Sequence, residues 1–407
     1  MRKINTLDFQ RATRRTQWEI NRQILLNLVR EHGPLSRADL ARRMDVGRSM
    51  VTKLTKELLT EGAILEGQVG EAARGRKPTM LYVRTRDRLV VAVDVRFSRT
   101  YVMLTDFSGT QLALESFETV FSPDELVEEL ARRVCRLLRS HAADGQVEGI
   151  GLVVPGMVDP RTGKVLNSPQ LGWQDVEVRS ALEAATGLPV QIENAPIACA
   201  LAHMWLGDQE GDGAADFVYV TVSDGVGTGL VVNGQVVRGY RHTAGEFGHS
   251  PLNPDGPQCL CGARGCWEAY TSNLATLARY LGRSDLSSAE KREMLKEHDI
   301  TFPDLMKRAR SGEARAREAL RETGRYLGLG LSMIVNALSP SHIVVGGEIT
   351  AVWDLIDDLV RLEVAERALT PAVARTPIIP EQTSSYPRLR GATALIAAPV
   401  FAAPQVA

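Results

Sequence analysis

The feature that most constrains this chain is a dense group of metal-binding residue types past its midpoint. Three of only five cysteines, Cys259, Cys261 and Cys266, lie within eighteen residues that begin at His249. Three thiolates and an imidazole are an accepted ligand set for structural Zn²⁺, and glycines at 262 and 265 free the backbone to fold around an ion. Four protein ligands leave no open position, so we expect the zinc to organise structure rather than attack a substrate. The alternative is an ordinary loop with small, buried cysteines.

The remaining cysteines and the hydropathy indicate the cellular compartment in which the protein is expected to act. Cys135 and Cys199 lie in helical patterns and are expected to be inert core residues. Metal-type cysteine spacing without a disulfide framework favours a reducing cytoplasm. No apolar run approaches the length that spans a bilayer, and residues 1–8 lack the apolar core of a signal peptide. We therefore expect a cytoplasmic protein that does not enter a membrane.

Length and charge divide the chain. At 407 residues it exceeds what one hydrophobic core supports, so two or three domains are expected. The formal net charge of −1 hides an asymmetry: residues 1–88 hold 19 Lys and Arg against 10 Asp and Glu, and the remainder holds 29 against 39. A basic head on an acidic body suggests that the head binds a polyanion, although a merely solvated basic face would have the same composition.

The basic head has the pattern of a helix-turn-helix. Apolar residues at helical spacing predict a first helix over about 16–31, which His32-Gly33-Pro34 ends. Ser36 precedes Asp39 by three residues, a capping signature that starts a second helix through Met44. A short turn at 45–47 then leads into a third helix.

The third helix has two contrasting faces. Val51, Leu54 and Leu58 form its buried side. Hydroxyls and cations on the opposite stripe suit a recognition helix in a major groove. The residues expected to contact DNA here are Arg48, Ser49, Thr52, Lys53 and Lys56. A small three-helix bundle with a solvated third helix is the alternative.

A basic loop follows this helix. Residues 64–66 and 80–83 are expected to be two short strands, and the loop between them contains Arg74-Gly75-Arg76-Lys77-Pro78. Such a segment is slim enough to enter a minor groove, where its cations meet strong negative potential. We therefore interpret residues 1–88 as a winged helix-turn-helix domain with Arg74, Arg76 and Lys77 on its wing, although basic linkers are also common.

The acidic body reads as two α/β lobes with a cleft between them. Strands are expected at 89–93, 101–105, 112–119, 149–154, 190–194, 217–222 and 343–347, with helices at 124–139 and 196–206 and a hairpin turn at Asn233-Gly234. The stretch 284–300 lacks clear periodicity and is expected to be a surface excursion. We assign residues 89–195 with about 383–407 to the first lobe, and 196–382 to the second, with the zinc loop and an oligomerisation surface.

Several segments of the chain together resemble the ROK family of bacterial repressors and sugar kinases, over about residues 15–400. They are 75–78 (GRKP), 154–159 (VPGMVD), 167–173 (NSPQLGW), 193–194 (EN), 225–229 (GVGTG) and the block from 245–249 (GEFGH) to 266–268 (CWE). The resemblance implies an actin-like, ribonuclease H-like two-lobe fold, a structural zinc held by His249 and the three cysteines, and a homodimer or homotetramer. Its repressor branch includes xylose, glucose and N-acetylglucosamine repressors.

The resemblance also implies a sugar site. At the positions that hold sugar in the family, this chain has Asn194, Glu246, His249 and Glu268. Carboxylates accept hydrogen bonds from sugar hydroxyls, and an amide can both donate and accept. A zinc-bound histidine has a fixed orientation, so its free ring N–H could point at one hydroxyl. The alternative for the two glutamates is support of the zinc loop.

Two departures from the family argue against a kinase. Family kinases have an aspartate after the Glu-Asn pair as the base for the sugar hydroxyl, and here that residue is Ala195. Their first phosphate loop has two glycines where this chain has Arg96 and Phe97, whose side chains obstruct the approach of backbone amides to a phosphate. The glycine-rich segment at 225–229 remains but is weak evidence for ATP.

We therefore expect a DNA-binding transcriptional regulator, most simply a repressor, of carbohydrate uptake or catabolism genes, without enzyme activity. Its partners would be double-stranded operator DNA and a monosaccharide or sugar-phosphate effector, and dimerisation would place two recognition helices on paired half-sites. One alternative is an ATP-dependent sugar kinase with a DNA-binding head. Another is a repressor controlled by a partner protein, with a vestigial sugar cleft.

Overall fold

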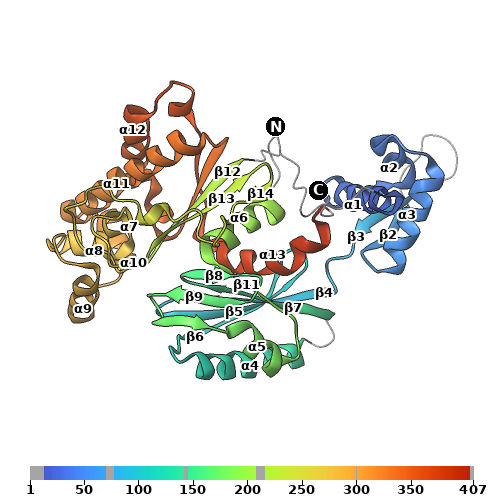
Figure 1. The fold of residues 1–407 in the computed structure, drawn as a ribbon, viewed down its shortest axis with the longest axis horizontal. Coiled ribbons are helices and arrows are strands. Elements are labelled where there is room, and N and C mark those ends of the chain that lie inside the picture. The colour runs from blue at the N-terminus through green and yellow to red at the C-terminus, as the bar shows by residue number, and fades with distance from the viewer. Residues whose placement is uncertain (1–12, 70–77, 142–144, 208–215, 299, 404–407) are drawn as a thin grey trace.

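The computed structural model describes residues 13–69, 78–141, 145–207, 216–298 and 300–403 (Figure 1). A small N-terminal head lies at one end, and two larger lobes, each built on a five-stranded sheet, make up the rest. Among the helices in these ranges, none has both the length and the apolar character needed to cross a membrane.

The head consists of three helices and a small antiparallel sheet with the strand order β1-β3-β2. The elements are α1 (Arg14–His32), β1 (Leu35–Ser36), α2 (Arg37–Met44), α3 (Arg48–Thr60), β2 (Ile64–Val69) and β3 (Thr79–Val83). The predicted start of α2 is confirmed, because the side chains of Ser36 and Asp39 each accept a hydrogen bond from the other residue's backbone N–H. The loop between β2 and β3 contains Arg74, Arg76 and Lys77, which lie outside the described residues.

The first lobe has a mixed sheet with the strand order β11-β7-β4-β5-β6. Its strands are β4 (Arg88–Val95), β5 (Arg99–Asp106), β6 (Gln111–Glu118), β7 (Gln146–Val154) and β11 (Val190–Asn194). The helices α4 (Pro123–Ser140) and α5 (Val178–Thr186) cover one face, and the last helix, α13 (Pro387–Phe401), covers the other (Figure 1). A small sheet that we did not predict precedes α5, with the strands β8 (Met157–Asp159), β9 (Lys164–Ser168) and β10 (Trp173–Val176).

The second lobe has the strand order β14-β13-β12-β15-β16. Its strands are β12 (Phe217–Val222), β13 (Val226–Val232), β14 (Gln235–Val236), β15 (His342–Gly346) and β16 (Ile378–Pro380). The predicted turn at Asn233-Gly234 is confirmed, because Val232 pairs with Gln235 across it. Alternate residues of β12 face opposite sides, so Tyr219 packs with α6 (Ala195–Leu206) while Val220 packs with α11 (Ala314–Leu338). The other helices are α7 (Glu268–Thr271), α8 (Asn273–Tyr280), α9 (Ser288–His298), α10 (Phe302–Arg310) and α12 (Asp357–Arg367).

One expectation about the body was wrong and another was incomplete. The stretch 284–300, expected to be a surface excursion, contains the helix α9, which buries Ser288, Lys291 and Met294 and leaves its other described side chains exposed or half-buried. Two of those three side chains are polar, so the buried face lacks an apolar period. Cys135 is exposed rather than buried, because it lies on the outward face of α4, whereas Cys199 is buried as expected.

The head is joined to the C-terminal end of α13. On α1, the Gln23 side-chain amide donates to the carbonyls of Val400 (3.1 Å) and Ala402 (3.0 Å), and the Asn27 amide donates to that of Phe401 (2.8 Å). The last carbonyls of a helix lack partners within the helix, so these two amides satisfy groups that would otherwise need water. The apolar core of the head also continues into Phe401. One helix of the body therefore ends inside the head.

Candidate metal centre and ligand pocket

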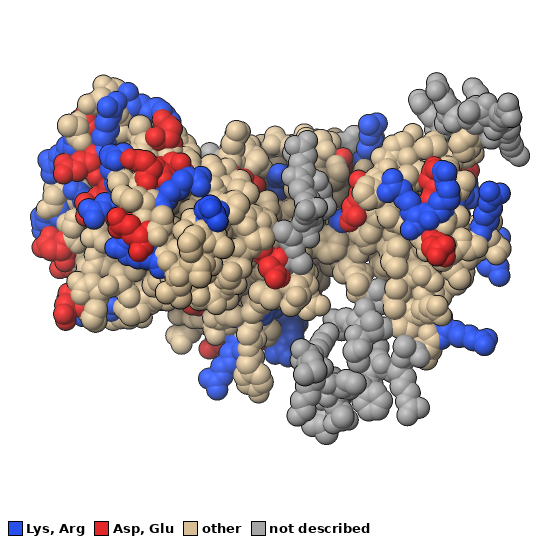
Figure 2. Space-filling view, turned by 90° about the horizontal axis from the view of Figure 1, so that it is seen from above, with Lys and Arg blue, Asp and Glu red and all other residues tan. Residues whose placement is uncertain are grey.

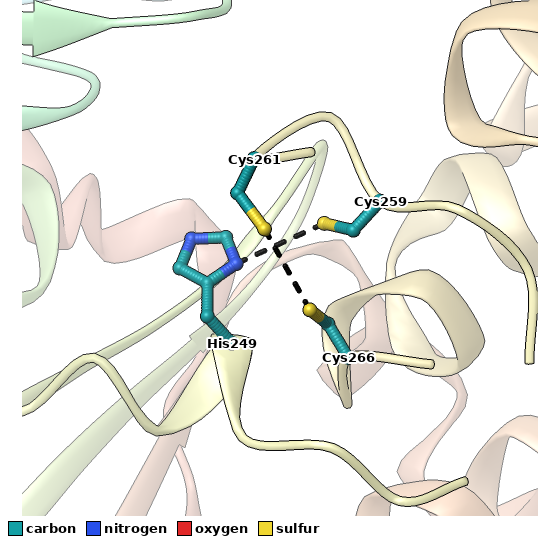
Figure 3. Close-up of side chains that lie close together, drawn as sticks. All are labelled: His249, Cys259, Cys261 and Cys266. Atoms are coloured by element: carbon teal, nitrogen blue, oxygen red, sulfur yellow. Dashed lines mark hydrogen bonds between the residues drawn. The ribbon is translucent and has the colours of Figure 1, made fainter. Parts of the chain in front are cut away.

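The cluster predicted as a metal site forms in the second lobe. One ligand atom each from His249, Cys259, Cys261 and Cys266 lies within 4.8 Å of all the others (Figure 3). His249 ends a single 3₁₀ turn, and Cys266 stands two residues before the start of α7. The cysteines are not joined by disulfides, and the Sγ atoms of Cys261 and Cys266 are 3.7 Å apart. The four residues could hold one metal ion.

The backbone of the loop depends on the glycines that the sequence pointed to. Gly262 has a φ of 92° and Gly265 a φ of 65°, in the left-handed region that favours glycine. At Gly265 a Cβ atom would lie 1.5 Å from the backbone oxygen of Asn253, so no side chain fits there. Bridges between Pro251 and Cys266 and between Gln258 and Arg264 close the loop.

The two ring nitrogens of His249 face different neighbours. Its Nδ1 lies 3.8 Å from the Sγ of Cys259, whereas its Nε2 lies 3.9 Å from a carboxylate oxygen of Glu246. Burial has the largest effect on the pKa of Glu246 and raises it; His249 opposes the rise, and the charge of Glu268 adds to it. An ion on the Nδ1 side would fix the ring with Nε2 directed at Glu246.

One pocket brings together all four residues predicted to contact sugar. Asn194, Glu246, His249 and Glu268 line it, although Asn194 is far along the chain from the other three. The first lobe contributes residues 155–157, Asn167 and Gln170, and the second contributes Ser223 and the turn 225–227. The pocket therefore lies between the lobes, with carboxylate, amide and imidazole groups on its wall, which suit a small ligand rich in hydroxyls.

Glu268 belongs to the pocket and to the metal loop at once. One of its carboxylate oxygens accepts a hydrogen bond from the backbone N–H of Val226 (2.9 Å), and the other accepts one from the Sγ of Cys259 (3.4 Å). It thus ties the glycine-rich turn to the cysteine loop. Support of the loop and contact with a ligand are compatible for this residue.

Asn194 is held by the helix that it begins. Its Oδ1 accepts from the backbone N–H of Ile197 (3.1 Å), so the side chain caps α6. Its own backbone N–H donates to the buried carboxylate of Glu193 (2.9 Å), which also pairs with Arg238. Because Oδ1 is engaged, the amide NH₂ is the group that can donate to a ligand.

The family resemblance put Ala195 at the position of the kinase base and Arg96 in the first phosphate loop. Ala195, the first residue of α6, lines the pocket with a methyl group. Nearby, the fully buried carboxylate of Asp94 lies between two guanidinium groups, 2.6 Å from Arg96 and 2.9 Å from Arg388. Arg96 also reaches across to Glu348 of the second lobe at 3.6 Å. Charged side chains thus pair with one another around Asp94.

On the head, the predicted pattern of α3 is confirmed. Val51, Leu54 and Leu58 are buried. The residues proposed for DNA contact are all exposed: Arg48, Ser49, Thr52, Lys53 and Lys56. In Figure 2, Lys and Arg gather on the head end of the visible face, whereas the second lobe mixes Lys and Arg with Asp and Glu.

Sequence reasoning missed part of the pocket wall. Asn167 and Gln170 belong to a motif that carried the family resemblance, but we gave them no role. No sequence pattern pointed to Arg388 as a pocket residue, since a single arginine near the start of a helix is usually a solvated surface residue. It reaches the pocket because α13 returns the chain to the first lobe.

Comparison with known proteins agrees with this geometry. The sequence model of the ROK family matches residues 90–398, so the chain belongs to the ROK family. A xylose repressor of Bacillus subtilis (strain 168) is 28% identical over 354 residues, which make up 86% of this chain and 87% of the repressor. The DNA-binding transcriptional dual regulator NagC of Escherichia coli (strain K12) is 27% identical over 334 residues, or 82% of this chain and 81% of NagC.

Solved structures share the fold. A ROK family transcriptional regulator, described as a homologue of the E. coli MLC protein, superposes with a TM-score of 0.78 at 24% identity and covers 95% of this chain and 97% of its own. A ROK family glucokinase from Streptomyces griseus, in complex with glucose and AMPPNP, gives a TM-score of 0.64 at 26% identity, with 75% of this chain and 98% of the kinase covered. The two-lobed body is therefore the fold that ROK regulators and sugar kinases share.

Proposed function

We propose that this protein is a sugar-responsive transcriptional repressor that binds operator DNA through its head and a monosaccharide or sugar phosphate between its lobes. The observation that carries the proposal is the pocket, which gathers Asn194, Glu246, His249 and Glu268 beside the cysteine loop. Two relatives that match over more than four fifths of this chain are named as regulators of transcription, one of them for xylose.

The head is proposed to be a winged helix-turn-helix domain. Its helix α3 turns apolar side chains inward and presents the cations Arg48, Lys53 and Lys56 to solvent, as a recognition helix in a major groove requires. We further propose that Arg74, Arg76 and Lys77, on the loop between β2 and β3, enter a minor groove. The regulator structure covers 95% of this chain and the kinase only 75%, which fits a head that the kinase lacks.

We propose three units with the boundaries expected from sequence: 1–88, then 89–195 with about 383–407, then 196–382. The family match begins at residue 90, next to the first boundary. α13 packs on β4 and β7 of the first sheet, which supports returning the C-terminal segment to the first lobe. α6 packs on β12 and β13 of the second sheet, which supports a boundary near Ala195.

The metal is proposed to be one structural Zn²⁺ per chain, held by His249, Cys259, Cys261 and Cys266. In a tetrahedral site with Zn–S bonds of about 2.3 Å, two sulfurs lie about 3.8 Å apart. The Sγ atoms of Cys261 and Cys266, at 3.7 Å, fit that spacing and are far too distant for a disulfide bond. When bound, the zinc would supply structural cross-linking and fix the ring of His249.

Phosphoryl transfer is proposed to be lost. A methyl group at Ala195 cannot take a proton from a sugar hydroxyl. Arg96 and Arg388 neutralise Asp94 from within the chain, and the side chain of Arg96 stands where the family loop has glycine. The main rival is an active sugar kinase with a DNA-binding head, since the related glucokinase has the same fold as the body of this chain. Turnover of ATP with any common hexose or pentose would favour that rival.

A physical route for the response to sugar is available in α13. Arg388, near its first residue, lines the pocket, and the carbonyls at its far end accept from Gln23 and Asn27 of the head. The two ends are about 20 Å apart along the helix. We propose that ligand binding between the lobes shifts α13 and thereby the head. Such control requires that the ligand bind the two arrangements with different affinity.

The protein is further proposed to act in the cytoplasm. It is proposed to be a homodimer or homotetramer, because paired recognition helices match paired half-sites of an operator. The function can be tested by capture of fragmented genomic DNA on purified protein, followed by sequencing. We expect enrichment of intergenic fragments beside genes for sugar uptake or breakdown, and a change in their retention when the matching sugar is added. Capture with no sequence preference would contradict the proposal.

A further inference from the structure

The helix α9 forms the wall behind the cysteine loop. The backbone N–H of Ser288, at the start of α9, donates to the carbonyl of Gln258 (2.8 Å), next to Cys259. Before it, the Oγ of Ser287 accepts from the N–H of Glu290 (3.2 Å), and the carboxylate of Glu290 accepts from the N–H of Ser287 (2.8 Å). The capping box fixes the amino end of α9. The hydrogen bond from Ser288 holds that end against the loop.

Lys291 lies on the buried face of this helix. Its side chain is only 1% exposed, and its Nζ donates to the carbonyl of Ala269 at 3.5 Å. Ala269 packs in one cluster with Cys259 and Cys266, so the carbonyl that Lys291 contacts belongs to the residue packed against the two buried thiols. Among the described residues Lys291 forms no ion pair within 4.0 Å. A buried cation without an anionic partner is costly, and buried charges in proteins are normally paired.

A second, half-buried cation adds to the positive charge of this region. Arg279 of α8 donates to the carbonyl of Tyr270 (2.8 Å) and to the hydroxyl of Thr323, all of which are neutral acceptors. Burial lowers the pKa of Lys291 to about 8, and the charge of Arg279 acts in the same direction. The charge of Asp285 raises the pKa of Lys291, and that of Glu322 raises the pKa of Arg279. Among the described residues, however, neither carboxylate lies within ion-pair distance (4.0 Å) of these two cations.

The cysteine loop would be anionic if it held zinc. Zn²⁺ with three thiolates and a neutral imidazole carries a net charge of −1, and its thiolates Cys259 and Cys266 are buried on the side of Ala269. We propose that Lys291 is the buried counter-charge of the zinc centre and stabilises its metal-bound form. This inference rests on the zinc proposed above. The amino end of α9, with its positive dipole, faces the loop with the same sign of charge.

This role differs from simple packing in one measurable way. If Lys291 only fills space, its replacement should lower the stability of the zinc-bound and the zinc-free protein equally. If it balances the anionic centre, its positive charge is useful only when zinc is bound and is unfavourable when zinc is absent. The replacement should then weaken zinc binding and leave the zinc-free protein as stable as before or more so.

The test compares Lys291→Met with Lys296→Met, which removes an exposed lysine from the same helix, in the full chain. Zinc affinity is measured by competition with a chromogenic chelator, and melting temperature is measured with and without zinc. For Lys291→Met we expect zinc affinity to fall by about 10- to 100-fold, as for other outer-shell partners of metal ligands. Lys296→Met should stay within about twofold of wild type, well below that range.

A second variant keeps the test sharp if the first folds poorly. Lys291→Gln retains a donor for the carbonyl of Ala269 but removes the charge, so it too should lose zinc affinity. Unchanged affinity in Lys291→Gln, or an equal loss of melting temperature with and without zinc in Lys291→Met, would overturn the inference. A wild-type protein that binds no zinc would instead overturn the zinc proposal on which it rests, so the two failures are distinguishable.

Discussion

The guanidinium of Arg96 lies 2.6 Å from the buried carboxylate of Asp94, in the segment that we propose to match the first phosphate loop of the related kinases. Arg388 approaches the other oxygen of the same carboxylate at 2.9 Å. Asp94 is therefore already neutralised by cations from within the chain and is fully buried. Arg96 also pairs with Glu348, so the same side chain links the two lobes.

This arrangement predicts that the catalytic aspartate alone will not restore a kinase. Wild type should phosphorylate no common hexose or pentose, and Ala195→Asp should remain inactive because Arg96 and Phe97 still occupy the phosphate loop. Returning glycine at both of those positions as well should allow weak ATP binding. A coupled assay with ATP and a sugar panel, and calorimetry with an ATP analogue, measure the two effects. Activity in wild type would show that the chain is an enzyme.

The metal centre predicts a joint loss of zinc and stability. Cys261→Ser should reduce zinc content and lower the free energy of unfolding by more than about 3 kcal/mol, since loss of a metal ligand exceeds the usual effect of a single substitution. Cys135→Ser is the matched control, because Cys135 is exposed and far from the loop in sequence. Metal analysis and thermal unfolding of both variants are the measurements. Freshly purified wild type without zinc would contradict the assignment.

The exposed face of α3 predicts where DNA affinity resides. Lys53→Ala and Lys56→Ala should each weaken binding, and each should reduce the salt dependence of log Kd by about 0.9 if the lysine touches one phosphate. Lys296→Ala, an exposed lysine of the second lobe, should leave both quantities unchanged. Fluorescence anisotropy at several salt concentrations gives both numbers. Sequence-specific binding that survives deletion of residues 1–88 would contradict the role of the head.

The junction of α1 with α13 predicts a variant that binds both partners but no longer couples them. Replacing Gln23 and Asn27 together by alanine removes the donors to Val400, Phe401 and Ala402. Sugar affinity should stay near wild type, while the effect of sugar on operator affinity should shrink from the typical coupling of about 1–3 kcal/mol. Anisotropy titrations with and without sugar measure this difference. An undiminished effect of sugar would mean that α13 is not the route.

Much of the fold was predictable because local signals agree with it. The capping pair Ser36 and Asp39, the apolar periods of α1 and α3, and the turn at Asn233 all lie where short-range chemistry decides the backbone. The metal loop was predictable for the same reason, since its ligands fall within eighteen residues. The sugar pocket was not: its residues are far apart in the chain, and only the family resemblance grouped them.

The features that were not predicted also have specific physical causes. The helix α9 turns Ser288 and Lys291 inward, so it lacks the apolar period that reveals a helix, although Ser287 and Glu290 form a capping pair that the sequence displays. Cys135 was misplaced because it follows the buried Val134 on α4, where one step along the helix turns a side chain from core to solvent. Arg388 and Asp94 are far apart in the sequence, so no local sequence pattern predicts that they pair.

The most direct test of the whole account uses Glu246→Ala. Removing this carboxylate leaves the metal ligands and the head intact but deprives a bound sugar of one acceptor, at a cost of about 1–3 kcal/mol, or roughly 5- to 150-fold in Kd. Operator fragments captured from genomic DNA are titrated with wild type and variant by anisotropy, across xylose, glucose, N-acetylglucosamine and their phosphates. The account predicts that a sugar which changes operator affinity in wild type needs correspondingly higher concentrations in Glu246→Ala, when the two proteins are compared at matched zinc content. An identical sugar response in the two proteins would contradict the pocket as the sensor and favour control by a partner protein.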